Sequence, residues 1–548
     1  MPQSVPTKYT QLLKKGAKAP VYIVEFEGLT TRYSNLLVKN PTGPVKPYLA
    51  GLSGSTGQIT VDEGRSSIGS MTFKIIDKNS EITELNAFNV LQNRLVTIKT
   101  GFLEQPEIEY VNVFKGEVLD FSLSSDNITW KFQTLSLLKK QKSRIMTAST
   151  KLTAPIDDIV TTLPVIGTTQ FAAATGGAPP QFYVKIEDEV ISYTGVTATD
   201  FTGCVRGELG TVPVVHELEV ETRNLVVLEG NGVDLALQIM TSTGLGTNGP
   251  FDVLPASAGL AIDESLIDVA KFISERQKWL LFFSFRFELS EAEEGKKFIE
   301  SELFRFMNSY PIINNNGQIS FKVYTPPLPT ATTQEFTDAN LVGAPVWTGN
   351  ILARYFFNEV DLSFDFDFRT GEFVSRTFYE DSNSQVKYGQ TKTLPLKSRG
   401  MRTSVTTLKI IDRFPLRVFK RFANPSPILR AKTFFSERLV EPGDVVRLTS
   451  SKIPNLQTGK RGVVAELVEV VRIAPNWTDG SQGLLLLNTG FSAGRKYAAI
   501  SPSSAPPVNF PNFAAATPAE KNYAFISQEV SPTVGIMGDG SDGYYITP

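Results

Sequence analysis

Cys204 and His216 are the residues whose chemistry could be catalytic at short spacing. They are the only cysteine and the only histidine in the chain, and a thiol beside an imidazole is the pairing that activates a nucleophilic cysteine. Both lie in a turn-rich segment, residues 181–220, that offers no evident third residue to orient the imidazole. We therefore expect a packed cysteine and a surface histidine. One cysteine and one histidine also exclude an internal disulfide and metal sites built from several thiolates or imidazoles.

A row of acidic residues is the second candidate. Glu359, Asp361, Asp365 and Asp367 alternate with apolar residues along one predicted strand. Alternate residues of a strand lie about 7 Å apart on one face, a spacing that suits the paired acids of a glycosidase or a calcium site. The alternation is itself typical of a strand with one solvated and one buried face, and we expect that structural role. A polysaccharide depolymerase using Asp361, Asp365 or Asp367 is the alternative.

Glycine-rich stretches occur at residues 51–57 and 244–249, and neither has the Gly-Lys-Ser/Thr of a phosphate-binding loop. Neither clearly follows a strand and opens a helix, as a dinucleotide-binding fingerprint does. No Gly-x-Ser-x-Gly marks a nucleophilic serine. The sequence therefore predicts a protein that is not an enzyme, with no catalytic residues, no cofactor and no metal.

A long basic stretch is the least ordinary feature of the charge pattern. Residues 392–432 carry eleven lysines and arginines against one acid, Asp412, whereas residues 181–223 carry eight acids and three bases. The basic stretch lacks the regular aromatic interleaving of proteins that bind single-stranded nucleic acid. Its partner could be nucleic acid, a neighbouring subunit or only solvent, and these alternatives stay open.

The overall composition is that of an ordinary globular protein. The 548 residues are 41% apolar and 20% charged, with a net charge of −2. At ~150 residues per domain, this length predicts three or four domains, and the small net charge excludes a general affinity for nucleic acid. Residues 1–20 lack the apolar core of a secretion signal. The most apolar window, residues 279–287, is too short to span a membrane and is expected to be a core strand, so we expect no stable membrane insertion.

Apolar periodicity and turn residues indicate a mainly β protein with an α/β middle domain. Short strands such as the one that carries Tyr22, Val24 and Phe26 on one face favour closed or nearly closed β structures. Runs rich in proline and threonine, up to residue 180 and at 326–333, are expected linkers. We predict a first β-barrel domain at 1–150, a small inserted β module with its linker at 151–228, the middle domain at 229–330, a second β-barrel domain at 331–492 and an extended C-terminal arm at 493–548.

Three helices are predicted in the middle domain. Residues 233–240 have apolar side chains at helical spacing, and residues 266–273 repeat that spacing after Asp263, a capping residue. Ser290 and Glu293 have the spacing of a capping box, which predicts that a third helix opens there and ends before Tyr310.

Several stretches resemble a known family of assembly proteins. Residues 181–220, with the motifs KIEDEVISYTG and TGCVRG followed by His216, resemble a cassette found in tail proteins of tailed bacteriophages. Further resemblances are to phage tail hub proteins: residues 21–29 and 62–77 to their opening barrel, residues 233–319 to their helical intermediate region, and residues 439–448 to a turn of their second barrel. The chain thus resembles the central baseplate hub, or tail-tip hub, of tailed bacteriophages of the siphophage type.

This resemblance implies a function and a set of partners. In that family, two similar barrels per chain and three chains form a pseudo-sixfold ring that continues the tail tube. The chain would be a structural virion protein of the tail tip or baseplate, assembled in the host cytoplasm as a homotrimer. It would close or continue the tube, attach fibres or a spike, and let DNA pass during ejection. Its partners would be the distal tail protein ring, the tape-measure protein, and tail fibre or spike proteins, with transient contact with DNA.

A receptor-binding tail spike or fibre protein that recognises host surface glycan is the alternative function. Such a protein predicts clustered exposed aromatic residues or a repeated β-helix. The sequence shows neither pattern, and no period of 20–50 residues repeats within it.

Overall fold

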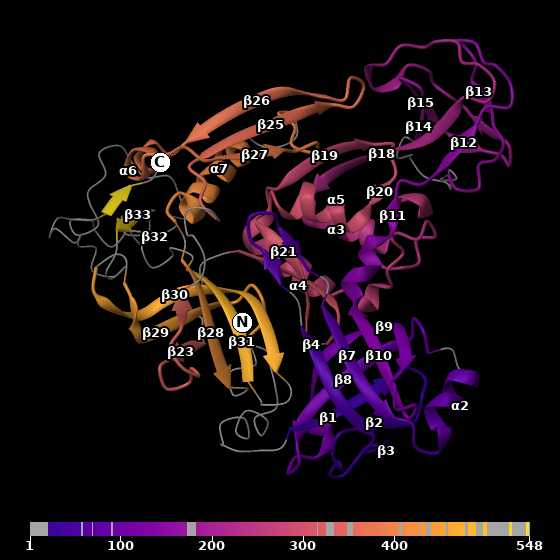
Figure 1. Ribbon diagram of the computed structural model, residues 1–548. Coiled ribbons are helices and arrows are strands. Elements are labelled where there is room, and N and C mark those ends of the chain that lie inside the picture. Colours follow the sequence, from indigo (N-terminus) through magenta and orange to yellow (C-terminus); the bar gives the residue numbers. More distant parts are fainter. Residues whose placement is uncertain are drawn as a thin grey trace. The chain divides into compact units, whose positions relative to one another are not determined.

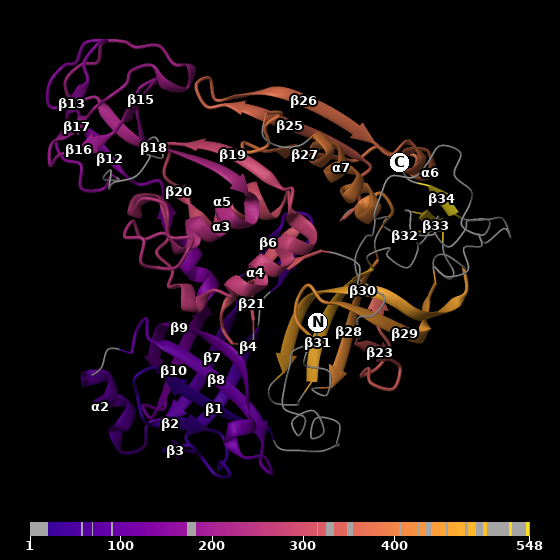
Figure 2. The same cartoon turned by 180° about the vertical axis from the view of Figure 1, so that it is seen from behind.

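The computed structural model describes most of the chain (Figures 1 and 2). The described residues are 20–55, 58–67, 69–88, 91–171, 182–314, 316–324, 334–347, 355–404, 408–425, 427–434, 440–455, 459–476 and 481–488, with the strand backbones at 497–500, 525–528 and 544–546. Most of the described elements are strands, which confirms the predicted mainly β fold. In these ranges no helix is long and apolar enough to cross a membrane. The expected linkers at 172–180 and 326–333 lie outside the described residues.

The first barrel is an eight-stranded sheet with the order β3-β2-β1-β8-β9-β10-β7-β4. Alternate side chains of its strands fill one core, in which Phe73 stacks on Phe132 with ring centroids 5.1 Å apart. The helix α2 (Glu81–Phe88) connects β7 to β8. The strands are β1 (Pro20–Phe26), β2 (Arg32–Ser34), β3 (Val45–Lys46), β4 (Leu49–Ser55), β7 (Ser70–Ile76), β8 (Leu95–Phe102), β9 (Val111–Leu123) and β10 (Thr129–Ser136).

The two edge strands of this sheet, β3 and β4, are consecutive in the chain. Only Pro47 and Tyr48 separate them, and three peptide units span at most about 11 Å. The Ile76 amide on β7 also donates to the Tyr48 carbonyl at 2.8 Å. The sheet therefore curls back on itself into a barrel-like form, as predicted.

The small module consists of two sheets around one core. Phe171, Tyr193 and Phe201 pack together in that core. One sheet contains β12 (Ser149–Lys151), β18 (Glu221–Asn231), β14 (Phe182–Ile186) and β15 (Glu189–Tyr193), and the other contains β13 (Thr162–Pro164), β17 (Asp200–Thr202) and β16 (Gly195–Val196). The second half of β18 pairs with β19 (Ser284–Leu289) of the middle domain. Because β18 runs through residue 228, it joins the module directly to the middle domain.

The middle domain packs helices and a hairpin, β21 (Ser309–Ile313) and β22 (Ile319–Val323), around the largest core. The first predicted helix is confirmed as α3 (Gly232–Thr241), which Asn231 caps by accepting a hydrogen bond from the Val233 amide at 3.0 Å. The second predicted helix is α4 (Val269–Glu275). Its cap is Asp268 rather than Asp263, because Asp263 caps a separate 3-10 turn.

Two predictions for the middle domain are wrong. The third helix does not open at the Ser290 capping box, because Glu293 and Glu294 form the short strand β20, which pairs with β11 (Arg144–Ile145), and α5 (Gly295–Phe298) begins after it. The apolar window at 279–287 is only in part a core strand. Its first two residues, 279 and 280, are the end of a π-helical turn that continues α4. The next two, Leu281 and Phe282, are 56% and 70% exposed.

A three-stranded sheet with the order β26-β25-β27 follows in the chain. β25 (Glu359–Asp367) is antiparallel to β26 (Glu372–Glu380) and parallel to β27 (Thr393–Lys397), and α6 (Ser382–Tyr388) connects β26 to β27. Apolar residues of β25 and of α7 (Leu408–Phe422) enter the core of the middle domain. The turn of the hairpin reaches the small module, where Arg369 donates to the Gly210 carbonyl at 2.9 Å.

The second barrel has six strands in the order β23-β29-β30-β31-β28-β24. They are β23 (Glu335–Thr337), β24 (Val346–Trp347), β28 (Ile428–Phe434), β29 (Val445–Pro454), β30 (Arg461–Asn476) and β31 (Ser481–Asn488). Its edge strands are again consecutive in the chain, and their connection bonds to both sides. The Asp338 carboxylate accepts from the Ser450 hydroxyl at 2.6 Å on β29, and the Val342 amide donates to the Lys432 carbonyl at 2.7 Å on β28. This connection thus bridges the two edges of the sheet.

Little of the C-terminal arm is described. The backbones of β32 (Tyr497–Ile500), β33 (Phe525–Gln528) and β34 (Tyr544–Ile546) form an antiparallel three-stranded sheet, so the arm is not extended throughout. The rest of the arm predicted at 493–548 lies outside the described residues.

Candidate assembly surfaces

His216 is buried, so the predicted surface histidine is wrong. The ring is 0% exposed, with Nδ1 2.8 Å from a Glu187 carboxylate oxygen and Nε2 2.9 Å from one of Glu189. Each ring nitrogen therefore lies within hydrogen-bonding distance of one carboxylate. Two carboxylates at the β14–β15 turn thus provide partners for both polar atoms of a buried ring.

Glu189 is the centre of this cluster. Its fully buried carboxylate accepts two hydrogen bonds from Arg206, both at 2.7 Å, and one each from the amides of Gly207 and Val214 at 3.1 Å. Burial opposes ionisation, yet the hydrogen bonds from Arg206, Val214 and His216 outweigh it and lower the pKa of Glu189 below its ordinary value. The polar residues of the cassette are therefore a structural cluster that joins three segments of the module.

Cys204 is packed, as predicted. Its side chain is 4% exposed within the module core, and its thiol lies 3.5 Å from the Phe201 carbonyl. Burial raises the pKa of the Cys204 thiol to about 11, which leaves almost no thiolate to act as a nucleophile at neutral pH. No group of three or more histidine, cysteine and acidic side chains that would hold a metal ion exists in the described part of the chain.

The acidic row on β25 has the structural role that the alternation predicted. Asp361 forms a bidentate pair with Arg376 at 2.7 and 2.8 Å, and Asp367 pairs with Arg369 at 2.8 Å. Hydrogen bonds from Arg369 hold the pKa of Asp367 at about 2. Asp365 interrupts the alternation, because its φ of 54° marks an irregularity and its carboxylate turns to Thr403.

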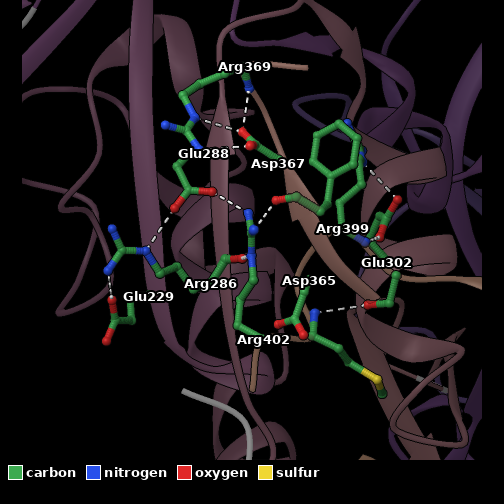
Figure 3. Close-up of polar contacts among 12 residues, drawn as sticks. Glu229, Arg286, Glu288, Glu302, Asp365, Asp367, Arg369, Arg399 and Arg402 are labelled. Atoms are coloured by element: carbon green, nitrogen blue, oxygen red, sulfur yellow. Dashed lines mark hydrogen bonds and ion pairs between the residues drawn. The ribbon is translucent and has the colours of Figure 1, made fainter. Parts of the chain in front are cut away.

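The basic stretch meets an acidic face of the middle domain in an ion-pair seam (Figure 3). The seam consists of Glu229 on β18, Arg286 and Glu288 on β19, and Arg402. Arg286 bonds to Glu229 at 3.0 Å and to Glu288 at 2.8 Å. Arg402 continues the alternation of charge by pairing with Glu288 and also donates to the Phe366 carbonyl of β25.

Arg399 makes a parallel connection beside this seam. It donates to Glu302 at 2.9 Å and to both carboxylate oxygens of Glu293 at 3.0 Å. Gly400 follows it, and its carbonyl accepts from the Arg286 amide at 2.9 Å. A Cβ at Gly400 would lie 2.0 Å from the Phe287 ring, so only glycine permits this close approach. Part of the basic stretch therefore binds within the chain rather than to DNA or to a neighbouring subunit.

A ribbon from the first barrel enters the core of the middle domain. β5 (Ile59–Thr60) and β6 (Arg65–Ser66) form this ribbon between β4 and β7, and the side chains of Ile59 and Val61 are 1% and 3% exposed in the middle-domain core. The Ser66 amide donates to Glu300 at 3.0 Å, and Lys296 donates to the Ser66 carbonyl at 2.8 Å. The first barrel is thus joined to the middle domain by buried contacts.

The second barrel contacts the middle domain and the ribbon through a buried triad, which consists of Arg421, Glu469 and Tyr310. Glu469 on β30 pairs with Arg421 of α7 and accepts from the Tyr310 hydroxyl, with the side chains of the ion pair 2% and 0% exposed. Arg421 also donates to the Val61 carbonyl of the ribbon at 3.3 Å. The attraction of Glu469 outweighs burial and raises the pKa of Arg421. Residues from both barrels, α7 and the middle domain therefore share one buried charge pair.

The two barrels share one arrangement of strands. The consecutive strands β7 to β10 lie in the spatial order β8-β9-β10-β7, and the consecutive strands β28 to β31 lie in the order β29-β30-β31-β28. All of these neighbours are antiparallel, and an earlier strand of the same barrel, β4 or β24, pairs antiparallel with the first member of its set. Five strands are thus shared. The strand on the other side of each set differs in direction, since β1 is antiparallel to β8 and β23 is parallel to β29.

The central strand of each set also has the same irregularities. β9 and β30 are the longest strands of their barrels, with 13 and 16 residues. β9 has one extra residue opposite β10, at Leu119, and β30 has one extra residue opposite β31, at Val471. Each also has one extra residue opposite the strand before it, and β29 has a further irregularity opposite β30 that β8 lacks opposite β9. Because bulges re-aim a strand and are specific features of a fold, the two barrels share one arrangement of five strands.

Sequence reasoning missed the buried triad and the Glu189 cluster. A usable signal existed for Glu469, an acid placed between Val468 and Val470 in a run of valines, since a buried acid requires a paired base. The ribbon gave no such signal, because its apolar residues Ile59 and Val61 match a barrel strand as well as a separate ribbon.

No family model matches the sequence, and no curated protein does. Among solved structures, the chain is similar to a tail protein from Neisseria meningitidis MC58, with 10% identity, a TM-score of 0.37, and 86% of this chain and 97% of that chain covered. It is similar to the 43 kDa tail protein of prophage MuSo2 from Shewanella oneidensis, with 9% identity, a TM-score of 0.38, and 85% and 97% covered. It is also similar to a prophage tail protein from Listeria monocytogenes EGD-e, with 9% identity, a TM-score of 0.36, and 87% and 96% covered. TM-scores of this size do not establish a shared function. Any function proposed for this chain must therefore rest on its own residues and topology.

Proposed function

We propose that this chain is a structural protein of a bacteriophage tail, the subunit of a homotrimeric hub at the distal end of the tail. The strand arrangement that the two barrels share carries the proposal. Three chains with two similar barrels each provide six similar positions around one axis, which suits a ring that continues a tube of sixfold symmetry. The stretches that resemble tail hub proteins support the same role, because they run in order through the first barrel, the module, the middle domain and the second barrel.

The physical properties of the chain suit such a ring. A ring built from heterologous contacts closes without open-ended growth, and barrels leave few free strand edges for accidental pairing. The ribbon and the buried triad connect the two barrels through the middle domain. Each chain therefore carries two of the six positions as one connected unit.

The proposed role needs no catalysis. Asp361 and Asp367, which a depolymerase would use, are each paired with an arginine, and Asp365 accepts hydrogen bonds from hydroxyl groups. Cys204 and His216 lie in the interior of the module. In this proposal the hub works by assembly, with the distal tail protein ring and the tape-measure protein on one side, fibres or a spike on the other, and DNA crossing the ring during ejection.

Antibodies raised against the full chain should label virions at the distal tip of the tail. Immunogold electron microscopy measures this position directly, and preincubation of the antibody with purified chain is the matched control. Gold placed on fibres away from the tail axis would favour the receptor-binding alternative. Gold along the whole tail or on the head would contradict both roles.

A further inference from the structure

β26 presents an open backbone edge. In the order β26-β25-β27, β26 and β27 are the two edges of the sheet, and Figures 1 and 2 show β26 as the outermost strand of the sheet. Among the described residues, β26 pairs with β25 alone. Its nine residues span about 30 Å.

The hydrogen bonds of β25 show which side of each strand is open. The Glu359 amide donates to the Lys392 carbonyl at 3.2 Å, and the Ser398 amide donates to the Ser363 carbonyl at 3.0 Å. The odd-numbered residues of β25 therefore direct their backbone groups to the β27 side. Its even-numbered residues, such as Leu362, direct theirs to β26.

The register then identifies the open groups of β26. Leu362 pairs with Thr377, so Thr377 and its alternate neighbours bond to β25. The N–H and C=O groups of Val374, Arg376 and Phe378 point to the open edge, because these groups alternate in direction along a strand. The side chains of Val374 and Phe378 are 75% and 58% exposed. This edge is a row of backbone donors and acceptors with two exposed apolar side chains.

The other edge of the same sheet is protected. Even-numbered positions beside β27, such as Lys392 and Ser398, bond to β25, so Pro395 directs its nitrogen outwards. Proline has no N–H to offer there, a common means of blocking an edge strand. β26 has no proline among its residues. One edge of the sheet is thus blocked and the other is left able to receive a strand.

Charge excludes a second copy of β26 in the fully overlapping register. An antiparallel pairing centred on Arg376 would place Arg376 opposite Arg376 and Glu372 opposite Glu380, and like charges directly opposite destabilise a sheet. In the described part of the chain, Arg376 donates to Asp361 through Nε and one terminal nitrogen and lies over the Phe378 ring, so its guanidinium retains donors for another carboxylate. The charges suit a strand with an acid at its centre and bases at its ends.

We propose that β26 is the docking edge for an extended segment of a different polypeptide. The segment adds to the sheet as an antiparallel strand. It carries an acid opposite Arg376, apolar or β-branched residues opposite Val374 and Phe378, and bases opposite Glu372 and Glu380. This partner site goes beyond the hub role and does not depend on it.

Two labelled nonapeptides test the proposal on the full chain by fluorescence anisotropy. The first, KTVTETVTK, fits the charges of β26, and the second, KTVTKTVTK, has a lysine at its centre. We expect saturable binding of the first at about fivefold higher affinity than the second. Arg376→Gln should remove that preference, and Val374→Thr with Phe378→Thr should weaken both peptides. Leu37→Thr, which changes an equally exposed apolar residue of the first barrel, should change neither affinity.

Hydrogen exchange provides the second readout. Binding of the first peptide should slow amide exchange in residues 372–380. Equal affinity for the two peptides, or no slowing of exchange in this segment, would overturn the proposal. Self-association that Val374→Thr with Phe378→Thr abolishes would also overturn it, because the occupant would then be a second copy.

Discussion

Replacing Glu469 with glutamine should lower the free energy of unfolding by about 3–5 kcal/mol, the typical cost of leaving one partner of a buried ion pair alone. Arg421 would remain in the interior, with its side chain 2% exposed and its counterion gone. Tyr310 would lose a charged acceptor at the same time. Urea denaturation of the full chain, followed by tryptophan fluorescence, measures the change in the first cooperative transition.

Two further variants separate burial from charge in this test. Asp361→Asn removes a pair with Arg376, whose side chain is 59% exposed, and exposed pairs contribute little, so the transition should not move measurably. Joint replacement of Arg421 by methionine, Glu469 by leucine and Tyr310 by phenylalanine should recover much of the loss, because apolar residues of similar volume often substitute for buried ion pairs. A Glu469→Gln variant as stable as Asp361→Asn would contradict the importance of the buried triad.

Glu189→Gln should lower the free energy of unfolding of the small module by a similar amount, about 3–5 kcal/mol. The substitution leaves Arg206 and His216 without the carboxylate that they share. Glu187→Gln is the matched control. It removes the other carboxylate on His216, but the Glu187 side chain is 58% exposed, so a smaller effect is expected. Hydrogen exchange of residues 182–225 reports the stability of the module apart from the barrels.

The Glu189 cluster should also make the module sensitive to acid. Because the pKa of Glu189 is lower in the folded state than its ordinary value, its contribution is complete above a pH of about 4.3, the ordinary pKa of a glutamate. The contribution is lost as the pH falls from there through the folded pKa. Exchange in the module should rise over this range in the wild-type chain and change less in Glu189→Gln. The same pH dependence in both proteins would assign the sensitivity to other groups.

The sequence predicted those parts of the fold that local pattern determines. Helical spacing in α3 matched the structure, and so did the alternation in the first half of β25, before Asp365 interrupts it, because each pattern reports one buried face of one element. The third middle-domain helix was misplaced, because the pairing of Glu293 and Glu294 with β11 overrides a local capping pattern. Local periodicity does not predict which distant segments pair as strands.

The candidate site was less predictable than the fold, for the same reason. His216 was expected at the surface because no residue to orient its imidazole was evident in the sequence, and the approach of Glu187 and Glu189 through the β14–β15 turn supplies partners for the buried ring. Arg399, Arg402 and Arg421 appeared as one basic run, yet each meets acids more than 40 residues away in the sequence. The acidic partners of these arginines depend on tertiary packing, so a count of charges along the sequence cannot identify them.

A reconstruction of the tail tip by electron cryomicroscopy, computed without imposed symmetry, tests the central proposal most directly. Three copies of this chain should surround the tail axis, with six barrel densities in which β7 to β10 and β28 to β31 occupy alternating, superimposable positions. Six equivalent copies of the chain at the tail end, or a single copy, would contradict the proposed trimeric hub.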